Sequence, residues 1–152
     1  MKRSELIQKT KERFRLAELV CPHVYQRDGE KAWRYFPTAA LETLVAIRDI
    51  LDMPMHVNNW DIGGQFSQRG LRCNLCSLVA SKTRGGQLYV SAHMLGQGFD
   101  FTCSIPAEEV RAIIRKNTSK LPHPIRLEKD VSWVHVDIYP VDDKKKIVEF
   151  NG

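Results

Sequence analysis

Three side chains that suit a metal ion lie in two short stretches of the sequence. His93 and Asp100 belong to residues 91–100, and His135 belongs to residues 132–137. Two imidazole nitrogens and one carboxylate oxygen are ligands that zinc accepts, and a set of three leaves a fourth position open. Hydrolytic zinc needs that open position, because the reacting water occupies it. The residue types therefore predict a metal-dependent hydrolase with one catalytic zinc ion.

The residues around these side chains alternate in polarity as they do in half-buried β-strands. Asp100 lies between two phenylalanines, and His135 lies between two valines. Because successive side chains of a strand point to opposite faces, Asp100, His135 and Asp137 should lie on polar faces while their apolar neighbours face the core. Ordinary polar faces of a half-exposed sheet would show the same alternation, so the pattern alone leaves both interpretations open.

Apolar spacing predicts the elements that carry these stretches. Pro37 opens a helix in which apolar residues recur at spacings of four, three and four up to Leu51, and Pro106 opens a second helix. A short helix is expected near the N-terminus, followed by an irregular pattern in residues 18–36 and a long irregular stretch in residues 60–88. The expected strands are residues 55–58, 88–90, 98–103, 125–128, 133–139 and 147–150.

Helices and strands that mix without a regular βαβ repeat predict the α+β class. The C-terminal strands look like hairpins, so we expect a small, mostly antiparallel sheet with helices packed on one side. The 152 residues suit a single domain. Within it we interpret residues 1–36 as an N-terminal extension and residues 37–150 as the core that carries the site.

The formal net charge of +5 permits a polyanionic partner without requiring one. The sequence has no alternation of basic and aromatic residues like that of RNA-binding sheets, so no nucleic-acid partner is expected. The first residues are charged and lack the apolar stretch of a signal peptide, and no apolar run approaches the ~20 residues of a membrane span. We therefore expect a monomer made in the cytoplasm, with no membrane partner.

The spacing of both stretches resembles a family signature. Ser91, His93, Gly96 and Asp100 match the Ser-x-His-x-x-Gly-x-Ala-x-Asp signature of the zinc D-alanyl-D-alanine carboxypeptidases, with Gly98 in place of alanine. The segment from Trp133 to His135 is similar to the Trp-x-His segment in the phage branch of that family. Gly70-Leu71-Arg72 resembles its arginine motif more weakly. The resemblance spans roughly residues 37–140.

The resemblance implies the fold that these peptidases share with the hedgehog signalling domain, and it implies roles for individual residues. His93, Asp100 and His135 would be the zinc ligands, and Arg72 would contact the substrate or stabilise the oxyanion. The substrate would be a peptide of bacterial cell-wall peptidoglycan. Because no secretion signal is expected, a phage or prophage origin with release on lysis fits better than an exported housekeeping enzyme.

The sequence departs from the family at the catalytic base. Many members carry an acidic residue three positions before the last histidine ligand, where this chain has Ser132. Glu128 and Asp130 are the available replacements for a group that must take a proton from water and pass it to the leaving amine. Glu128 is favoured, because some phage-type members carry an acid in a similar Arg-x-Glu context, and Asp130 remains open.

Three further side chains are candidates for the surroundings of the metal. Asp137 could orient His135 as an outer carboxylate, or it could be a solvated aspartate beyond the site. Ser91 could hydrogen-bond the substrate, and Trp133 could form a wall of the pocket. A serine before a turn and a packed tryptophan need no such role, so these interpretations also stay open.

The four cysteines give a weaker metal signal. Cys73 and Cys76 form one CxxC pair, and Cys21 and Cys103 lie elsewhere. Together they could build a second, structural zinc site, but two CxxC pairs would be the strong signal and only one is present. Reduced thiols are the default expectation in the cytoplasm. The remaining histidines lack ligand-like spacing and are expected to be structural or surface residues: His23, His56 and His123.

The sequence thus predicts a zinc metallopeptidase that cleaves peptidoglycan, either as a D-Ala-D-Ala carboxypeptidase or as an endolysin-type endopeptidase. A non-catalytic, zinc-containing cell-wall-binding or phage structural module is the alternative, and Ser132 is the residue that favours it. A nucleic-acid binder that uses the positive charge is a third, weaker interpretation.

Overall fold

The computed structural model describes residues 1–141 and 144–152. The α-helices are α1 (Arg3–Lys11), α2 (Leu16–Leu19), α3 (Pro22–Asp28), α4 (Thr38–Leu51), α5 (Ser77–Arg84) and α6 (Ala107–Lys116). The strands are β1 (Gly98–Phe101), β2 (Ile125–Glu128), β3 (Val134–Asp137) and β4 (Ile147–Phe150), and the 3-10 helices are η1 (Gly29–Tyr35), η2 (Trp60–Ile62) and η3 (Thr118–Lys120). None of the described helices is both long enough and apolar enough to cross a bilayer.

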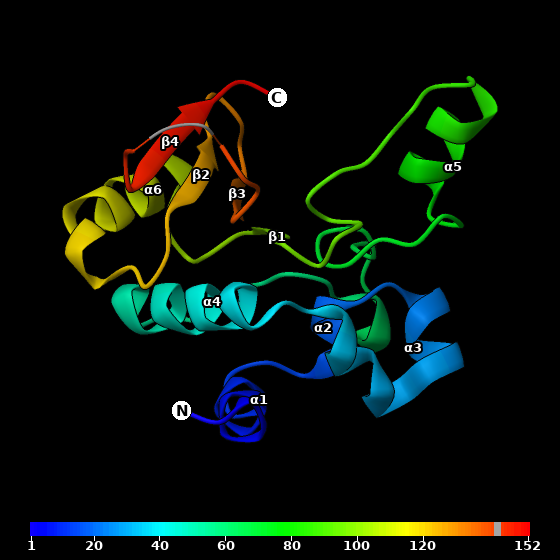
Figure 1. Cartoon of the computed structure of the whole chain (residues 1–152), viewed down its shortest axis with the longest axis horizontal. Helices are drawn as coiled ribbons and strands as arrows, with labels where there is room; N and C mark the ends of the chain where they lie inside the picture. The colour runs from blue at the N-terminus through cyan, green and yellow to red at the C-terminus, as the bar shows by residue number, and fades with distance from the viewer. Residues whose placement is uncertain (142–143) are drawn as a thin grey trace.

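The four strands form one small mixed sheet in the order β1-β3-β2-β4 (Figure 1). β3 pairs antiparallel with both β1 and β2, whereas β4 pairs parallel with β2. The predicted α+β class is confirmed, but the expected hairpin pairing is wrong for β4. β1 and β2 already occupy both edges of β3, so β4 pairs with the free edge of β2. β4 runs antiparallel to β3, as β2 does, and is therefore parallel to β2.

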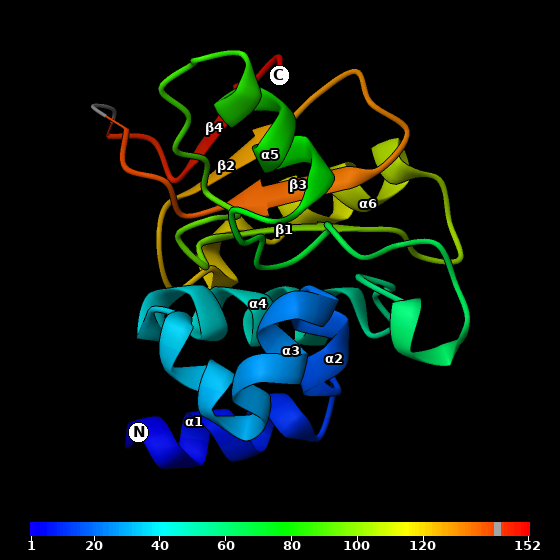
Figure 2. The same ribbon diagram turned by 90° about the vertical axis from the view of Figure 1, so that its right-hand side faces the viewer.

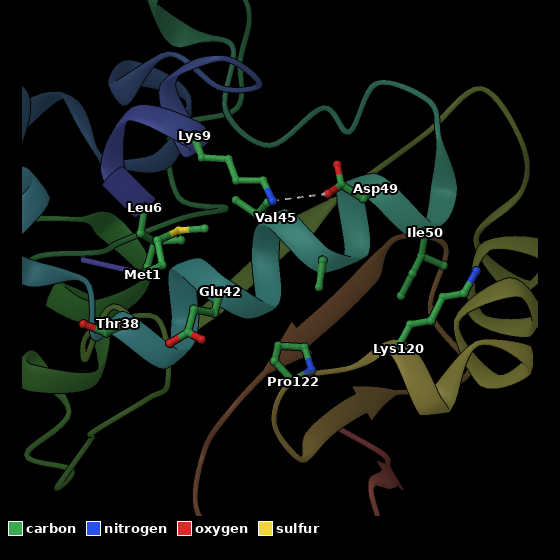
Figure 3. Close-up of a pocket in the computed structure, with 11 residues that line it drawn as sticks. Met1, Leu6, Lys9, Thr38, Glu42, Val45, Asp49, Ile50, Lys120 and Pro122 are labelled. Carbon is green, nitrogen blue, oxygen red and sulfur yellow. Dashed lines mark ion pairs between the residues drawn. The ribbon is translucent and has the colours of Figure 1, made fainter. Parts of the chain in front are cut away.

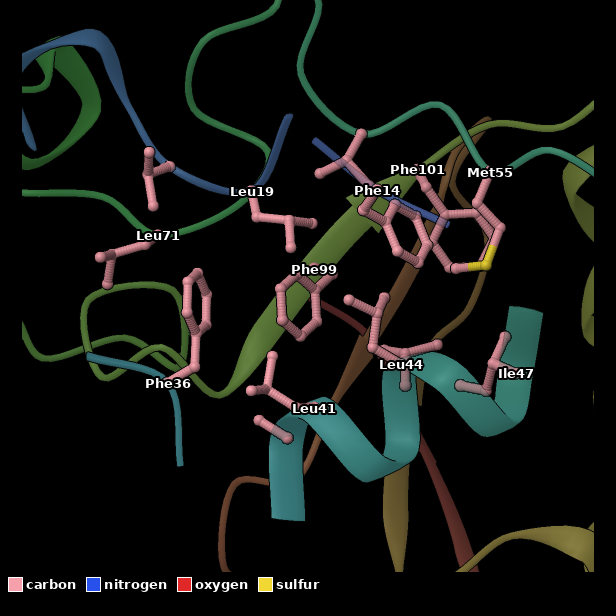
Figure 4. Packing of buried hydrophobic residues seen from close by; sticks show 14 of the residues in the cluster. Phe14, Leu19, Phe36, Leu41, Leu44, Ile47, Met55, Leu71, Phe99 and Phe101 are labelled. Atoms are coloured by element: carbon pink, nitrogen blue, oxygen red, sulfur yellow. The ribbon is translucent and has the colours of Figure 1, made fainter. Parts of the chain in front are cut away.

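The apolar face of the sheet packs against α4 and forms the centre of the core. Phe99 and Phe101 of β1 lie over Leu41, Leu44 and Ile47 of α4 (Figure 4). Each of these five side chains is at most 4% exposed. Full burial of one such side chain stabilises a fold by about 1.5–3 kcal/mol, so this packing fixes which face of the sheet points inward. The helix predicted from Pro37 to Leu51 is confirmed.

The helix predicted after Pro106 is also confirmed, and it holds the loop that leads into β3. Arg111 of α6 is buried. Its guanidinium donates hydrogen bonds to the carbonyl oxygens of Trp133 at 2.9 Å and of Val131 at 3.1 Å. On the same helix, Arg115 pairs with Glu149 of β4 at 2.6 Å. α6 therefore ties the start of β3 to the last strand.

The first 36 residues pack into the same core as the sheet. Figure 2 shows α1 below α4, α2 and α3 in front of α4 and extending toward α1, and the sheet above. Phe14, Leu19 and Phe36 belong to the hydrophobic cluster that contains Phe99, and the rings of Phe36 and Phe99 stack at 5.8 Å. Arg3 fastens the N-terminus, because its guanidinium donates to the carbonyl of Phe36 at 2.6 Å.

Two stretches that look irregular in the sequence contain helices. Pro22 is the first residue of α3 and Gly29 caps its end with a φ of 53°, so the residues that suggested interruptions mark a helix start and a helix end. The stretch 60–88 contains α5. Residues 88–90 form no strand, and Leu88 is 98% exposed.

The strand expected for residues 55–58 is reduced to an isolated bridge. Within that range, His56 makes an antiparallel bridge to Thr102, just beyond β1. The backbone bonds are reciprocal, with His56 N donating to Thr102 O at 2.8 Å and Thr102 N donating to His56 O at 3.1 Å. This bridge still fixes the end of β1 against the chain that follows α4.

Candidate metal centre

Asp100 and His135 meet because β1 and β3 pair with these two residues opposite each other. Side chains opposite each other across an antiparallel pair lie on the same face, which here is the face turned away from α4. The distance between His135 Nδ1 and Asp100 Oδ1 is 2.7 Å. The polar faces predicted from the alternation are thus one continuous surface.

His93 reaches the same surface from the turn that precedes β1. Gly96 in this turn has a φ of 67°, and a Cβ there would collide with the carbonyl oxygen of Tyr35, so the turn requires glycine. His93 Nε2 lies 3.2 Å from Asp100 Oδ2. Ligand atoms of His93, Asp100 and His135 all lie within 4.8 Å of one another, and the three residues are buried.

The outer nitrogen of each imidazole has its own hydrogen-bond partner. His93 Nδ1 lies 2.9 Å from the carbonyl oxygen of Gly70, which can only accept, so Nδ1 carries a proton. His135 Nε2 lies 2.6 Å from Asp137 Oδ2. When each imidazole carries a single proton, as a metal ligand must, these partners hold that proton on the outer nitrogen and turn the lone pairs of His93 Nε2 and His135 Nδ1 toward Asp100. Two lone pairs that face a carboxylate fit a cation, and zinc binds this set of donors.

The charges of the centre also favour a cation. Burial disfavours a charged His135, but its hydrogen bonds to Asp100 and Asp137 outweigh burial and raise the pKa of His135 to about 9. Burial likewise opposes ionisation of Asp100, yet hydrogen bonds from His135 and His93 hold the pKa of that carboxyl well below its ordinary range. Burial opposes the ionisation of Asp137 too, and hydrogen bonds from His135 and Arg126 still lower its pKa. The two ionised carboxylates stabilise a positive charge between them, whether a proton or a metal ion carries it.

Two arginines support the carboxylates. Arg126 donates two hydrogen bonds to Asp137, both at 2.8 Å, and its guanidinium lies 4.3 Å from the ring centre of Phe150. Arg72 Nη2 lies 3.4 Å from Asp100 Oδ2, and Arg72 Nε donates to the carbonyl of Gln68 at 2.6 Å. The outer carboxylate considered at Asp137 is therefore in contact with His135, and Arg72, expected to contact the substrate or the oxyanion, is in contact with Asp100.

A cavity of about 450 Å³ lies over the three candidate ligands. Ser91, Trp133 and Glu128, all named from the sequence, line it. Asp130 and Ser132 are exposed and are not among its lining residues. Of the two acidic residues considered as a base, Glu128 is the one that lines the cavity.

Sequence reasoning missed several residues of this cavity: Tyr89, Val90, Ala92, Arg126, Tyr139 and Phe150. Arg126 lies opposite Asp137 in the pairing of β2 with β3, so the alternation of residues 125–128 could have identified it. Phe150 reaches the site through the parallel pairing of β4 with β2. Nothing in the local sequence signals that pairing.

A separate hollow of about 500 Å³ lies between α1 and α4 (Figure 3). Leu6, Val45 and Ile50 contribute apolar walls, and Lys9 pairs with Asp49 at 4.0 Å. Its lining residues include neither histidine nor cysteine. The cavity over His93, unlike this hollow, therefore has a donor set for a metal.

Comparisons of the chain with protein-family models, curated proteins and solved structures gave no match. The centre itself is a buried group of two imidazoles and a carboxylate, with an acidic side chain and two arginines around an open cavity.

Proposed function

We propose that the protein is a zinc-dependent peptidase that cleaves peptide bonds in bacterial cell-wall peptidoglycan. The observation that carries the proposal is the convergence of His93 Nε2, Asp100 and His135 Nδ1 beside an open cavity, with both imidazole tautomers fixed from outside. Three ligands and an accessible fourth position are typical of catalytic rather than structural zinc. The peptidoglycan substrate and the hedgehog-like peptidase fold come from the motif resemblance and belong to the proposal.

The residues of the chain would divide the work of peptide hydrolysis among them. Bound zinc supplies Lewis-acid activation of a water and of the scissile carbonyl. Glu128 would accept the proton of the water and deliver it to the leaving amine, since it is the acidic side chain beside the ligands that has no role in holding them. Arg72 would stabilise negative charge on the substrate, either its carboxylate or the developing oxyanion.

A zinc-containing module that binds cell wall without cutting it is the second candidate. Ser132 favours this function, because it stands where the resembled family carries an acid and it is exposed outside the cavity. In that case the buried centre would serve to order the face that binds the wall.

Digestion of peptidoglycan tests the two functions against each other. We expect the zinc-loaded protein to release new amino termini or free D-alanine, and His93→Ala to release neither. Free D-alanine would indicate a carboxypeptidase, and new amino termini without it an endopeptidase. Pelleting of the protein with cell wall, with no product at any zinc loading, would support the binding module instead. Neither product nor pelleting would overturn both candidates.

A further inference from the structure

A second group of metal-ligating side chains lies outside the cavity over His93. Cys21, His23, Cys73 and Cys76 each offer one ligand atom, and these atoms all lie within 4.8 Å of one another. Cys73 Sγ is 3.4 Å from His23 Nδ1 and 3.9 Å from Cys76 Sγ. Cys76 Sγ is 3.9 Å from His23 Nδ1. The set includes His23, which the sequence suggested was a structural or surface residue, and it leaves out Cys103.

Backbone pairing brings the two halves of this group together. Val20 and Leu71 form a parallel bridge, in which Leu71 N donates to Leu19 O at 2.8 Å and Cys21 N donates to Leu71 O at 3.1 Å. Gly70 permits this approach, because a Cβ at that position would collide with the Leu19 carbonyl. Main-chain hydrogen bonds therefore hold the segment that carries Cys21 and His23 next to the segment that carries Cys73 and Cys76.

The spacing of the ligand atoms matches a tetrahedron around zinc. With zinc–sulfur bonds of ~2.3 Å and zinc–nitrogen bonds of ~2.0–2.1 Å, the edges of such a tetrahedron are about 3.5–3.8 Å. Three of the six separations fall between 3.4 and 3.9 Å, and the three that involve Cys21 lie within 4.8 Å. The Leu75 amide donates to Cys73 Sγ at 3.4 Å, the kind of outer hydrogen bond that stabilises a ligating thiolate.

We propose that Cys21, His23, Cys73 and Cys76 bind a second zinc ion in a closed, structural site. Three sulfurs and one nitrogen fill all four positions of tetrahedral zinc, so no position remains for a substrate. Cys21 and Cys76 are 0% and 2% exposed, so the inner side of the site is shielded from solvent, while Cys73 is half-buried and His23 is exposed on its outer side. This inference does not rest on the proposed function, because it uses none of the residues assigned to catalysis.

The second site would hold the chain segment that supports the first. In residues 69–72, the Arg69 carbonyl accepts from the Asp100 amide at 2.7 Å, the Gly70 carbonyl contacts His93, and Arg72 contacts Asp100. Cys73 follows directly. A zinc ion on the cysteines would therefore fix the end of the segment that orients His93 and Asp100, and its binding free energy would add to the free energy of unfolding.

Metal analysis of protein purified under reducing conditions separates the two sites. We expect two zinc equivalents in the wild type, one in Cys73→Ser/Cys76→Ser and one in His93→Ala. Cys103→Ser is the matched control and should keep both, because Cys103 lies outside both groups. If only the cysteine site exists, the wild type and His93→Ala would both hold one equivalent, so failure of the proposed function is distinguishable. Equal zinc content in the double serine variant and the wild type would overturn the proposal.

Cobalt substitution gives a readout that is independent of activity. Cobalt(II) bound by three thiolates shows intense sulfur-to-metal charge-transfer absorption, whereas the His93 centre has no sulfur ligand. We expect this absorption in the wild type, in His93→Ala and in Cys103→Ser, and we expect none in Cys73→Ser/Cys76→Ser. Its absence from the cobalt-loaded wild type, with all four thiols still free, would overturn the proposal.

His23→Ala is a second variant in case the double serine variant does not fold. His23 is exposed, whereas two of the cysteines are buried, so its replacement disturbs the core less. Loss of a direct ligand should weaken zinc binding at the sulfur site by more than the ~10–100-fold that loss of an outer partner costs. Chelator competition measures that affinity, and far-ultraviolet circular dichroism checks that the fold persists. Unchanged affinity in a folded His23→Ala protein would contradict the proposal.

Discussion

At the scale of single residues, the centre is defined by which atoms carry protons. The Gly70 carbonyl and the Asp137 carboxylate hold the outer imidazole nitrogens, so the inner ones face Asp100. Glu128 lines the same cavity without contributing to this arrangement. In the proposed peptidase, holding the ligands and moving a proton would be tasks of different side chains, and substitutions can test them separately.

Glu128→Gln should lower the rate of peptide hydrolysis by ~10²–10⁴-fold, the usual contribution of a general acid–base group. Zinc content should not change, because Glu128 is not among the grouped ligands. Asp130→Asn is the matched control, since Asp130 is exposed and outside the cavity lining. Activity assays with metal analysis check both variants. A large loss of activity in Asp130→Asn, with full activity in Glu128→Gln, would assign the base to Asp130 instead of Glu128.

His135 should make the stability of the metal-free protein depend on pH. The pKa of His135 is raised from 6.5 to about 9 in the folded chain, so its protonated form stabilises the fold fully below about pH 6.5 and that stabilisation is lost as the pH rises through about 9. The free energy of unfolding should fall by up to about 1.4 kcal/mol per pH unit in that window. Denaturant unfolding in a chelator measures this slope. An Asp137→Asn variant with an equally steep slope would contradict this explanation, because Asp137 is one of the two carboxylates that raise the pKa.

Residues of the metal centre could be predicted from the sequence where the pattern that identifies them lies in their own neighbouring residues. His93, Asp100 and His135 follow from alternation and motif spacing, and the structure brings the three together. His23 could not be predicted as a member of the cysteine group. Its position depends on the pairing of Val20 with Leu71 across the fold, and no local spacing reports that contact.

At the scale of elements, the turn between His93 and β1 depends on glycine for two separate reasons. Gly96 has a φ of 67° and also faces the Tyr35 carbonyl, whereas Gly86 has a φ of 69° with open space around it. A left-handed conformation alone costs an L-residue roughly 1–2 kcal/mol. Substitutions at these two glycines therefore separate the cost of backbone strain from the cost of steric collision.

Gly86→Ala should lower the free energy of unfolding by at most about 2 kcal/mol, because it adds only backbone strain. Gly96→Ala should cost more and should also weaken zinc binding, because the turn must shift away from Tyr35 and take His93 with it. Urea unfolding and zinc titration of both variants measure the difference. Equal losses of stability in the two variants would show that the Tyr35 contact has no effect.

Elements with strong apolar periodicity were predictable, and elements defined by tertiary contacts were not. α4 and α6 follow from spacing and from the prolines before them. α3 was obscured because Pro22 and Gly29 look like interruptions, although they are its first residue and its cap. β4 was placed correctly along the chain, but its parallel partner depends on which edge of the sheet is free.

At the scale of the whole molecule, the first 36 residues and the rest of the chain share one hydrophobic cluster. Phe14, Leu19 and Phe36 are each at most 2% exposed. Removing residues 1–36 would therefore open the core beneath Phe99. It would also remove Cys21 and His23 from the second group of candidate ligands.

A chain that begins at residue 37 should lose cooperative unfolding and bind zinc weakly at both centres. Near-ultraviolet circular dichroism during thermal unfolding tests the first expectation, and chelator competition tests the second. A chain without residues 1 and 2 is the control, because both are exposed. Cooperative unfolding of the shorter chain at the temperature of the full chain would show that the N-terminal helices are dispensable.

The segment from Arg69 to Cys76 also sets an order of events during translation. All four ligands of the cysteine group have been synthesised once Cys76 is made, whereas the other centre must wait for His135. Domains tend to fold from the N-terminus as the chain emerges. A zinc ion bound to the proposed cysteine site could therefore fix Gly70 and Arg72 in position before His135, the last ligand of the other centre, has been made.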